Sequence, residues 1–139
     1  MSIDRITLRL QSDSRTAYAL SEIVGREPLR SSERGSPVSS KRPNGPSRMV
    51  STAIFEWPAS WRSLGEFVDE LGEVLASIGE ARSDADDFSV DLVVAITSRP
   101  LGYVVELGDA QLSLLASVRC GLVVDAYSSD ERMEEESNG

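Results

Sequence analysis

The chain has 139 residues, a formal net charge of −9 at pH 7 and 40% hydrophobic residues. This length suits one domain with a hydrophobic core of its own and leaves little room for a second. The acidic balance disfavours general nucleic-acid binding, which depends on positive charge against phosphates. The sequence contains no histidine, which excludes Ser-His-Asp and Cys-His catalysis and the usual zinc sites.

Cysteine content and the N-terminal residues indicate the compartment. Cys120 is the single cysteine, so no internal disulfide can form and a reducing compartment is expected. We expect its side chain to be a small buried hydrophobe. Asp4, Arg5 and Arg9 interrupt the first apolar segment, unlike a secretory signal, and no apolar run is long enough for a bilayer. A cytoplasmic protein without a membrane partner is therefore predicted.

The first third of the chain predicts a strand, a helix and a long loop. Residues 3–10 alternate between apolar and polar side chains, as in a half-buried strand. Asp13 or Ser14 can cap a following helix, and Gly25 ends it. Residues 26–50 contain four prolines and two glycines, which predicts a loop. An Asn-Gly pair at positions 44 and 45 favours a hairpin turn within this loop.

The middle of the chain predicts two strands with an amphipathic helix between them. Residues 51–57 and 88–97 are rich in β-branched and aromatic side chains. The second strand is apolar on most of both faces, so an internal position in the sheet is expected. Residues 64–78 place apolar side chains at helical spacing, with Ser63 as the N-cap and Gly79 as the C-cap.

The C-terminal third predicts a short strand, a helix, a strand and a tail. Residues 103–107 form the short extra strand, and Asp109 caps the helix. The last strand covers residues 122–127. Residues 129–139 are polar and acidic, so we expect them to be disordered.

The order of these elements predicts the fold class. Residues 3–128 are expected to form one α+β domain, a two-layer sandwich with helices on one face of a mixed or antiparallel sheet. A ferredoxin-like, split βαβ arrangement is the more specific prediction.

Three segments of the chain together resemble a known family. Residues 23–28 read Ile-Val-Gly-Arg-Glu-Pro and are followed by Glu-Arg-Gly at 33–35. After the amphipathic helix, residues 122–127 read Leu-Val-Val-Asp-Ala-Tyr. Together these resemble the bacterial family called domain of unknown function 4279, over most of residues 3–128. The resemblance implies a small bacterial α+β protein and no particular activity.

The loop has the most unusual charge. Residues 26–48 carry a net +4, so the remainder of the chain sums to −13. Arg30, Arg34 and Arg42 are the candidates for holding an anionic ligand, because guanidinium groups match carboxylate and phosphate geometry. The alternative interpretation is a solvated loop in which the arginines serve solubility.

Four further side chains are candidate binding residues. Asp125 and Tyr127 share one face of the last strand. A buried Asp125 would need a structural partner, such as an arginine of the first strand, and a role as general base is the alternative. Trp57 and Trp61 are expected in the core or a lid, or, if exposed, as binding anchors.

Other sites are not indicated. Asp84, Asp86 and Asp87 mark a turn and lack the central glycine and distal glutamate of a calcium loop. The glycines fit neither nucleotide-binding fingerprint. We therefore expect no metal, no cofactor and no catalytic residues.

These observations favour a noncatalytic cytoplasmic protein that binds another macromolecule. An immunity-type inhibitor of a toxin is one version, because an acidic surface can mask a basic one. The alternative is a small-ligand-binding or regulatory domain that recognises an anionic metabolite through its arginine-rich loop. The oligomeric state is left open.

Overall fold

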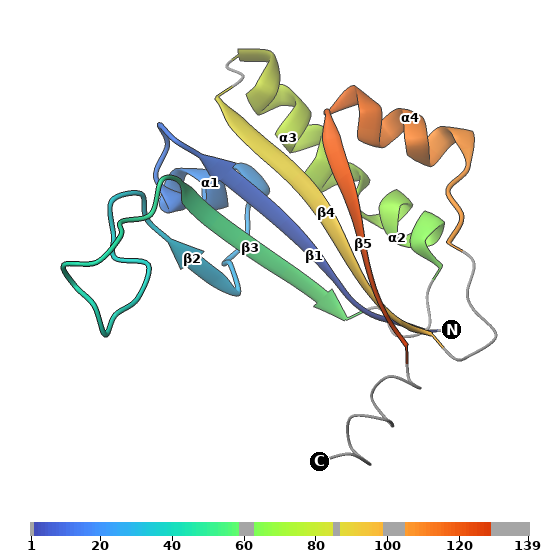
Figure 1. The fold of residues 1–139 in the computed structure, drawn as a ribbon. Coiled ribbons are helices and arrows are strands. Elements are labelled where there is room, and N and C mark those ends of the chain that lie inside the picture. Colours follow the sequence, from blue (N-terminus) through green and yellow to red (C-terminus); the bar gives the residue numbers. More distant parts are fainter. Residues whose placement is uncertain (1, 59–62, 85–86, 99–104, 129–139) are drawn as a thin grey trace, which may run out of the picture.

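The computed structural model describes residues 2–58, 63–84, 87–98 and 105–128. They form a five-stranded sheet of order β2-β3-β1-β4-β5, and four helices lie on one face of that sheet (Figure 1). The elements in chain order are β1 (Ser2–Ser12), α1 (Ala17–Val24), β2 (Arg30–Ser32), β3 (Ser51–Pro58), α2 (Leu64–Glu70), α3 (Gly72–Asp84), β4 (Phe88–Ser98), α4 (Asp109–Ser117) and β5 (Cys120–Ser128).

The sheet is mixed. Strand β1 lies in the middle and pairs antiparallel with both β3 and β4, and β2 pairs antiparallel with β3. Strand β5 runs parallel to β4, and α4 supplies the crossover that a parallel neighbour requires. The predicted α+β class is thereby confirmed, with β4 internal as expected. A ferredoxin-like arrangement is not confirmed by this strand order.

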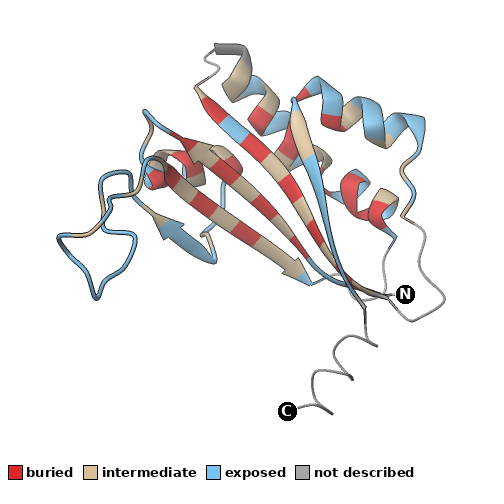
Figure 2. Cartoon of the chain, viewed as in Figure 1, coloured by how far each residue is buried: buried red, intermediate tan, exposed pale blue. Residues whose placement is uncertain are grey.

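The core lies between the sheet and the helices. Alternate residues of β1, β3 and β4 are buried, which Figure 2 shows as stripes along the strands. The amphipathic segment 64–78 faces this layer with its apolar side, as predicted. The fully buried side chains include Ile6, Leu8, Leu10, Leu20, Phe55, Val68, Leu75, Ile78, Leu92, Val94 and Ile96.

The first helix begins later than predicted. Thr16 is its N-cap, and the Thr16 hydroxyl accepts a hydrogen bond from Ala19 N at 3.1 Å. Neither Asp13 nor Ser14 caps the helix. The Ser14 hydroxyl instead donates a hydrogen bond to the Asp87 carboxylate. Gly25 ends the helix as predicted, with a left-handed φ of 78°.

The segment expected to be one helix forms two. The Ser63 hydroxyl caps α2 as predicted, accepting from Glu66 N at 3.2 Å. The helix then breaks at Leu71, next to Gly72, a residue of low helix propensity. Gly79 was predicted as the C-cap and instead lies inside α3, where a Cβ would meet Val118 Cγ1 at 3.1 Å. Its missing side chain therefore lets α3 approach the end of α4.

Two other expectations need correction, and a third concerns residues outside the described ranges. Residues 105–107 are not a strand, and residues 103–104 lie outside the described residues. Asp109 is the first residue of α4, and Gly108 occupies the N-cap position. The predicted disorder of 129–139 also falls outside the described residues. None of the described helices is long and apolar enough to cross a bilayer.

The loop at 26–50 contains more regular structure than predicted. It includes β2, and residues 35–38 run against 46–48 as a narrow ribbon with a bridge between Pro37 and Ser47. The turn of this ribbon is not a left-handed Asn-Gly hairpin. Two successive turns close it instead, through Arg42 N to Ser39 O at 3.1 Å and Gly45 N to Arg42 O at 2.9 Å.

Candidate binding face of the sheet

The face of the sheet opposite the helices carries charged, polar and apolar side chains. Strand register aligns Arg30 of β2, Ile54 of β3, Arg9 of β1 and Asp91 of β4 in one row across this face. We call this surface the open face. It is hollowed over about 500 Å³, and the hollow is lined by Arg5, Thr7, Arg9, Leu29, Arg30, Ile54, Glu56, Val93, Ala95, Asp125 and Tyr127.

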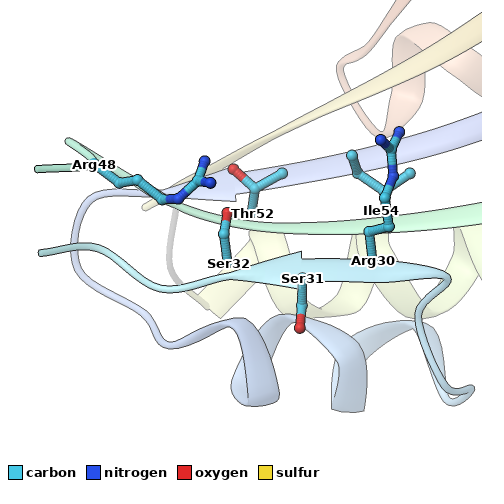
Figure 3. A pocket seen from close by; sticks show the side chains of 6 residues that line it. All are labelled: Arg30, Ser31, Ser32, Arg48, Thr52 and Ile54. Carbon is cyan, nitrogen blue, oxygen red and sulfur yellow. The ribbon is translucent and has the colours of Figure 1, made fainter. Parts of the chain in front are cut away.

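A second hollow of about 350 Å³ adjoins the first and shares Arg30 and Ile54 with it. The pairing of Ser32 with Thr52 places both hydroxyls beside these shared residues. Figure 3 shows both hydroxyl side chains, Arg30 and Arg48 on the same side of β2 and β3, whereas Ser31 points the other way. The two hollows therefore form one continuous depression near β2.

Arginines on the open face differ in how they are paired. Arg9 Nη2 lies 3.2 Å from Asp91 Oδ2, and Arg5 lies 3.7 Å from Glu56 Oε1. The Arg9 Nε is buried without a hydrogen-bond partner among the described residues. Arg30 forms no ion pair with any described acidic side chain. Unpaired guanidinium donors thus remain in the floor and at the rim of the depression.

Asp125 and Tyr127 lie at the β5 edge of the larger hollow. Both are exposed, and the Tyr127 hydroxyl donates to Asp125 Oδ2 at 2.8 Å. A structural partner, such as an arginine of the first strand, was expected for a buried Asp125. Asp125 is instead exposed on an edge strand, and it forms no ion pair with Arg5 or Arg9. The physical reason is that β4 separates β1 from β5, so Arg5 stands two strands away, roughly 10 Å.

Trp57 belongs to the helix-covered side. Its ring meets Phe67 edge to face, with the ring centroids 6.0 Å apart, and the Arg26 guanidinium lies 4.4 Å from its centroid. The interpretation of Trp57 as a core residue therefore fits this packing better than a role as an exposed anchor. Trp61 lies outside the described residues.

The loop arginines do not gather at one place. Arg34 Nη1 donates to the backbone oxygen of Asp13 at 2.5 Å, which ties the loop to the β1–α1 turn. Arg42 is exposed in the outer turn of the ribbon, and of the three predicted arginines Arg30 alone lines the two hollows described above. Arg48 joins it there, and sequence reasoning missed this residue as a candidate because β2 was not predicted.

Glu33 explains why the loop has a defined path. Its carboxylate accepts a bifurcated hydrogen bond from Ala17 N, with its two oxygens at 3.0 and 3.1 Å, and another hydrogen bond from the Ser51 hydroxyl at 3.1 Å. It therefore lies at the N-terminus of α1, where negative charge is favoured. These hydrogen bonds hold the part of the loop that follows β2 against α1 and β3.

Nucleophilic and metal chemistry find little support in the described residues. Burial, together with the nearby carboxylate of Asp91, raises the pKa of the Cys120 thiol to about 11, so it is protonated at neutral pH. The described residues contain no group of three side chains that could hold a metal. Asp87 instead pairs with Arg15 at 2.8 Å, while Asp86 lies outside the described residues.

Comparisons of the chain with protein family models, with curated proteins and with solved structures find no match. The resemblance to the domain of unknown function 4279 family therefore stays a prediction.

Proposed function

We propose that the chain is a noncatalytic binding protein whose open face engages another protein. The observation that carries this proposal is the one-sided cover of the sheet. Four helices bury one face, and the opposite face of the same strands is hollowed and exposed to solvent. A rigid sheet can present such a surface to a partner without a change of shape.

The composition of the open face supports contact with a protein. Leu29 is 57% exposed and Tyr127 is 44% exposed at opposite sides of the hollow, with arginines between them. Tyrosine and arginine are enriched in protein interfaces, and glutamate and aspartate are depleted there. The open face therefore has the residue types that give binding energy.

The outer surface of the helices, which we call the helix layer, differs in charge from the open face. It is acidic over α2 and α3, where the exposed carboxylates are Glu66, Asp69, Glu70, Glu73 and Glu80. This charge favours solubility and can steer a basic partner toward the molecule. We assign the partner contact to the open face and the long-range electrostatic attraction to the helix layer.

A cytoplasmic inhibitor of the immunity type is one version of this function. Occlusion of a partner's active surface requires a complementary face and no catalytic group, and the acidic helix layer can attract a partner that carries basic charge. We also propose a relation to the ferredoxin-like folds, because β3 and β4 run in the same direction on either side of β1, as in a split βαβ unit. Membership of the domain of unknown function 4279 family is compatible with both proposals.

The test compares two matched pairs of exposed side chains. The full chain is used to capture partners from the native host, and binding of the purified partner is then measured by calorimetry. Leu29→Ala with Tyr127→Ala alters the open face, and Leu112→Ala with Tyr18→Ala makes the same chemical change on exposed sites of α4 and α1. We expect the open-face pair to weaken binding about 10-fold or more, the effect of a typical hot spot.

The helix-layer pair is expected to change the dissociation constant less than about twofold. Circular dichroism of both double variants checks that each remains folded. A larger loss in the helix-layer pair would place the interface on the helices and refute the proposal. Equal affinity of the parent and both double variants would also refute the proposal, because it would exclude the open face from the interface.

A further inference from the structure

The smaller hollow has a lining suited to a second kind of ligand, distinct from a protein partner. The β2–β3 register sets Arg30 and Ser32 next to Ile54 and Thr52, so that two hydroxyls and one guanidinium line the hollow from adjacent strands. Arg48 enters from the ribbon and completes this wall (Figure 3). Two arginines and two hydroxyl groups thus surround the same hollow.

Backbone hydrogen bonds fix the position from which Arg48 reaches the hollow. Gly35 N donates to Arg48 O at 2.9 Å, and Arg48 N donates to Ser36 O at 2.8 Å. Gly35 has a φ of 86°, a left-handed conformation that a side chain would disfavour. The chain therefore holds Arg48 in the ribbon where it passes the end of β2, and the arginine is not part of a freely extended loop.

The two guanidinium groups are not neutralised by the described part of the chain. Arg5, Arg9 and Arg15 pair with described carboxylates, whereas neither Arg30 nor Arg48 does so. Arg48 Nη2 makes one long hydrogen bond, 3.4 Å, to the backbone oxygen of Val38. Two uncompensated positive charges beside hydroxyl donors, in a protein of charge −9, mark a place where an anion is favoured.

We propose that this hollow, the Arg30–Arg48 site, binds the dianionic phosphate group of a small phosphomonoester or free phosphate. Two positive charges match a dianion better than the single charge of a carboxylate. The three terminal oxygens of a phosphate also offer acceptors for both guanidinium forks and both hydroxyls. A volume of about 350 Å³ is near the lower end for ligand pockets, which suits a small group.

The site is open to solvent, so the expected affinity is modest. Exposed charges interact weakly in water and are screened by salt. We expect a dissociation constant on the order of 1 mM at low ionic strength, weakening as salt is added. Because the binding groups belong to this chain alone, phosphate binding can be tested on the isolated chain, with no protein on the open face.

The experiment is a titration of the full chain followed by its backbone amide resonances in NMR spectra. The probes are inorganic phosphate, a nucleoside monophosphate and acetate. We expect saturable shifts at residues 30–32 and 48–52 with both phosphates. Tighter binding of the nucleoside monophosphate would identify a phosphomonoester as the ligand, and equal or tighter binding of inorganic phosphate would identify the free ion.

Variants separate a site from diffuse attraction. Arg30→Gln or Arg48→Gln is expected to weaken phosphate binding about 10-fold or more, because each removes a charged hydrogen-bonding group. Arg42→Gln makes the same change in the same loop, outside both hollows, and is expected to weaken it less than about twofold. Arg48→Lys, which keeps the charge and loses the fork, is expected to fall between these two.

The charge of the ligand gives an independent check. The second pKa of a phosphomonoester is roughly 6, so binding at about pH 8 should be several-fold tighter than at about pH 5. The proposal fails if phosphate causes no saturable shifts, if Arg42→Gln weakens binding as much as Arg30→Gln, or if acetate binds as tightly as phosphate. Amide spectra of each variant show whether a loss reflects unfolding, and a variant that unfolds is replaced by Thr52→Val, which should weaken binding in a folded protein.

Discussion

The two faces of the sheet are built from the same strands and are opposite in character. Along β1, residues 6, 8 and 10 are fully buried beneath the helices, and Arg5 and Arg9, which alternate with them, form ion pairs on the open face. Along β4 the contrast is weaker, because Val93 and Ala95 bring apolar surface to the open side. A sheet covered on one side needs an apolar pattern on that side only. Val93 and Ala95 are therefore apolar residues that packing against the helices does not require.

Neighbouring residues of β4 give the largest expected difference between the faces. Leu92→Ala removes a fully buried side chain and should lower the free energy of unfolding by about 2–5 kcal/mol, through lost burial and the cavity left behind. Val93→Ala, on the open face, should cost about 1 kcal/mol or less. Urea denaturation of both variants and the parent measures this. Similar losses in the two variants would mean that the open face is covered in solution.

A glycine of β5 should give an intermediate effect and shows where the open face is tightly packed. A Cβ at Gly121 would collide with the Asp91 carboxylate, which is paired with Arg9. Gly121→Ala should therefore displace Asp91, weaken that pair and cost about 1–3 kcal/mol in thermal or urea unfolding. Gly72→Ala is the matched control, since a Cβ there meets nothing within 4 Å and the residue is helical. It should be neutral or stabilising by up to about 1 kcal/mol. Equal effects would show that Asp91 moves freely.

Local patterns in the sequence were sufficient for most of the fold. The alternation at residues 3–10, the capping serine at 63 and the left-handed stop at Gly25 all act over a few residues, and each was predicted correctly. The break at Leu71 was missed because the apolar spacing continues across it, although Leu71 itself leaves the helical conformation. Strand order could not be predicted, since pairing between distant strands leaves no short-range signal.

The candidate site was predicted less well than the fold, for the same reason. Arg30, Asp125 and Tyr127 were selected from local charge and face, and all three line the larger hollow. Arg34 and Arg42 were selected by the same loop charge, but the loop path directs them elsewhere. That path depends on β2 and on Glu33 at the N-terminus of α1, which are contacts between segments far apart in sequence. Arg48 could therefore be identified as a candidate only after these contacts were known.

The smallest expected effect is a pH dependence of the free energy of unfolding, which arises at one end of the sheet. The hydrogen bond from Arg15 holds the pKa of Asp87 below its ordinary value of 3.8. A lowered folded-state pKa stabilises the protein above pH 3.8, and this contribution is lost as the pH falls through the lower, folded value. Asp87→Asn should therefore be less stable than the parent at neutral pH, and the difference should shrink below pH 3.8. Asp13→Asn, at an exposed neighbouring turn, gives the background of removing one carboxylate. Urea unfolding at several pH values measures the difference, and a gap that stays constant into acid would show that the Arg15–Asp87 pair does not form in solution.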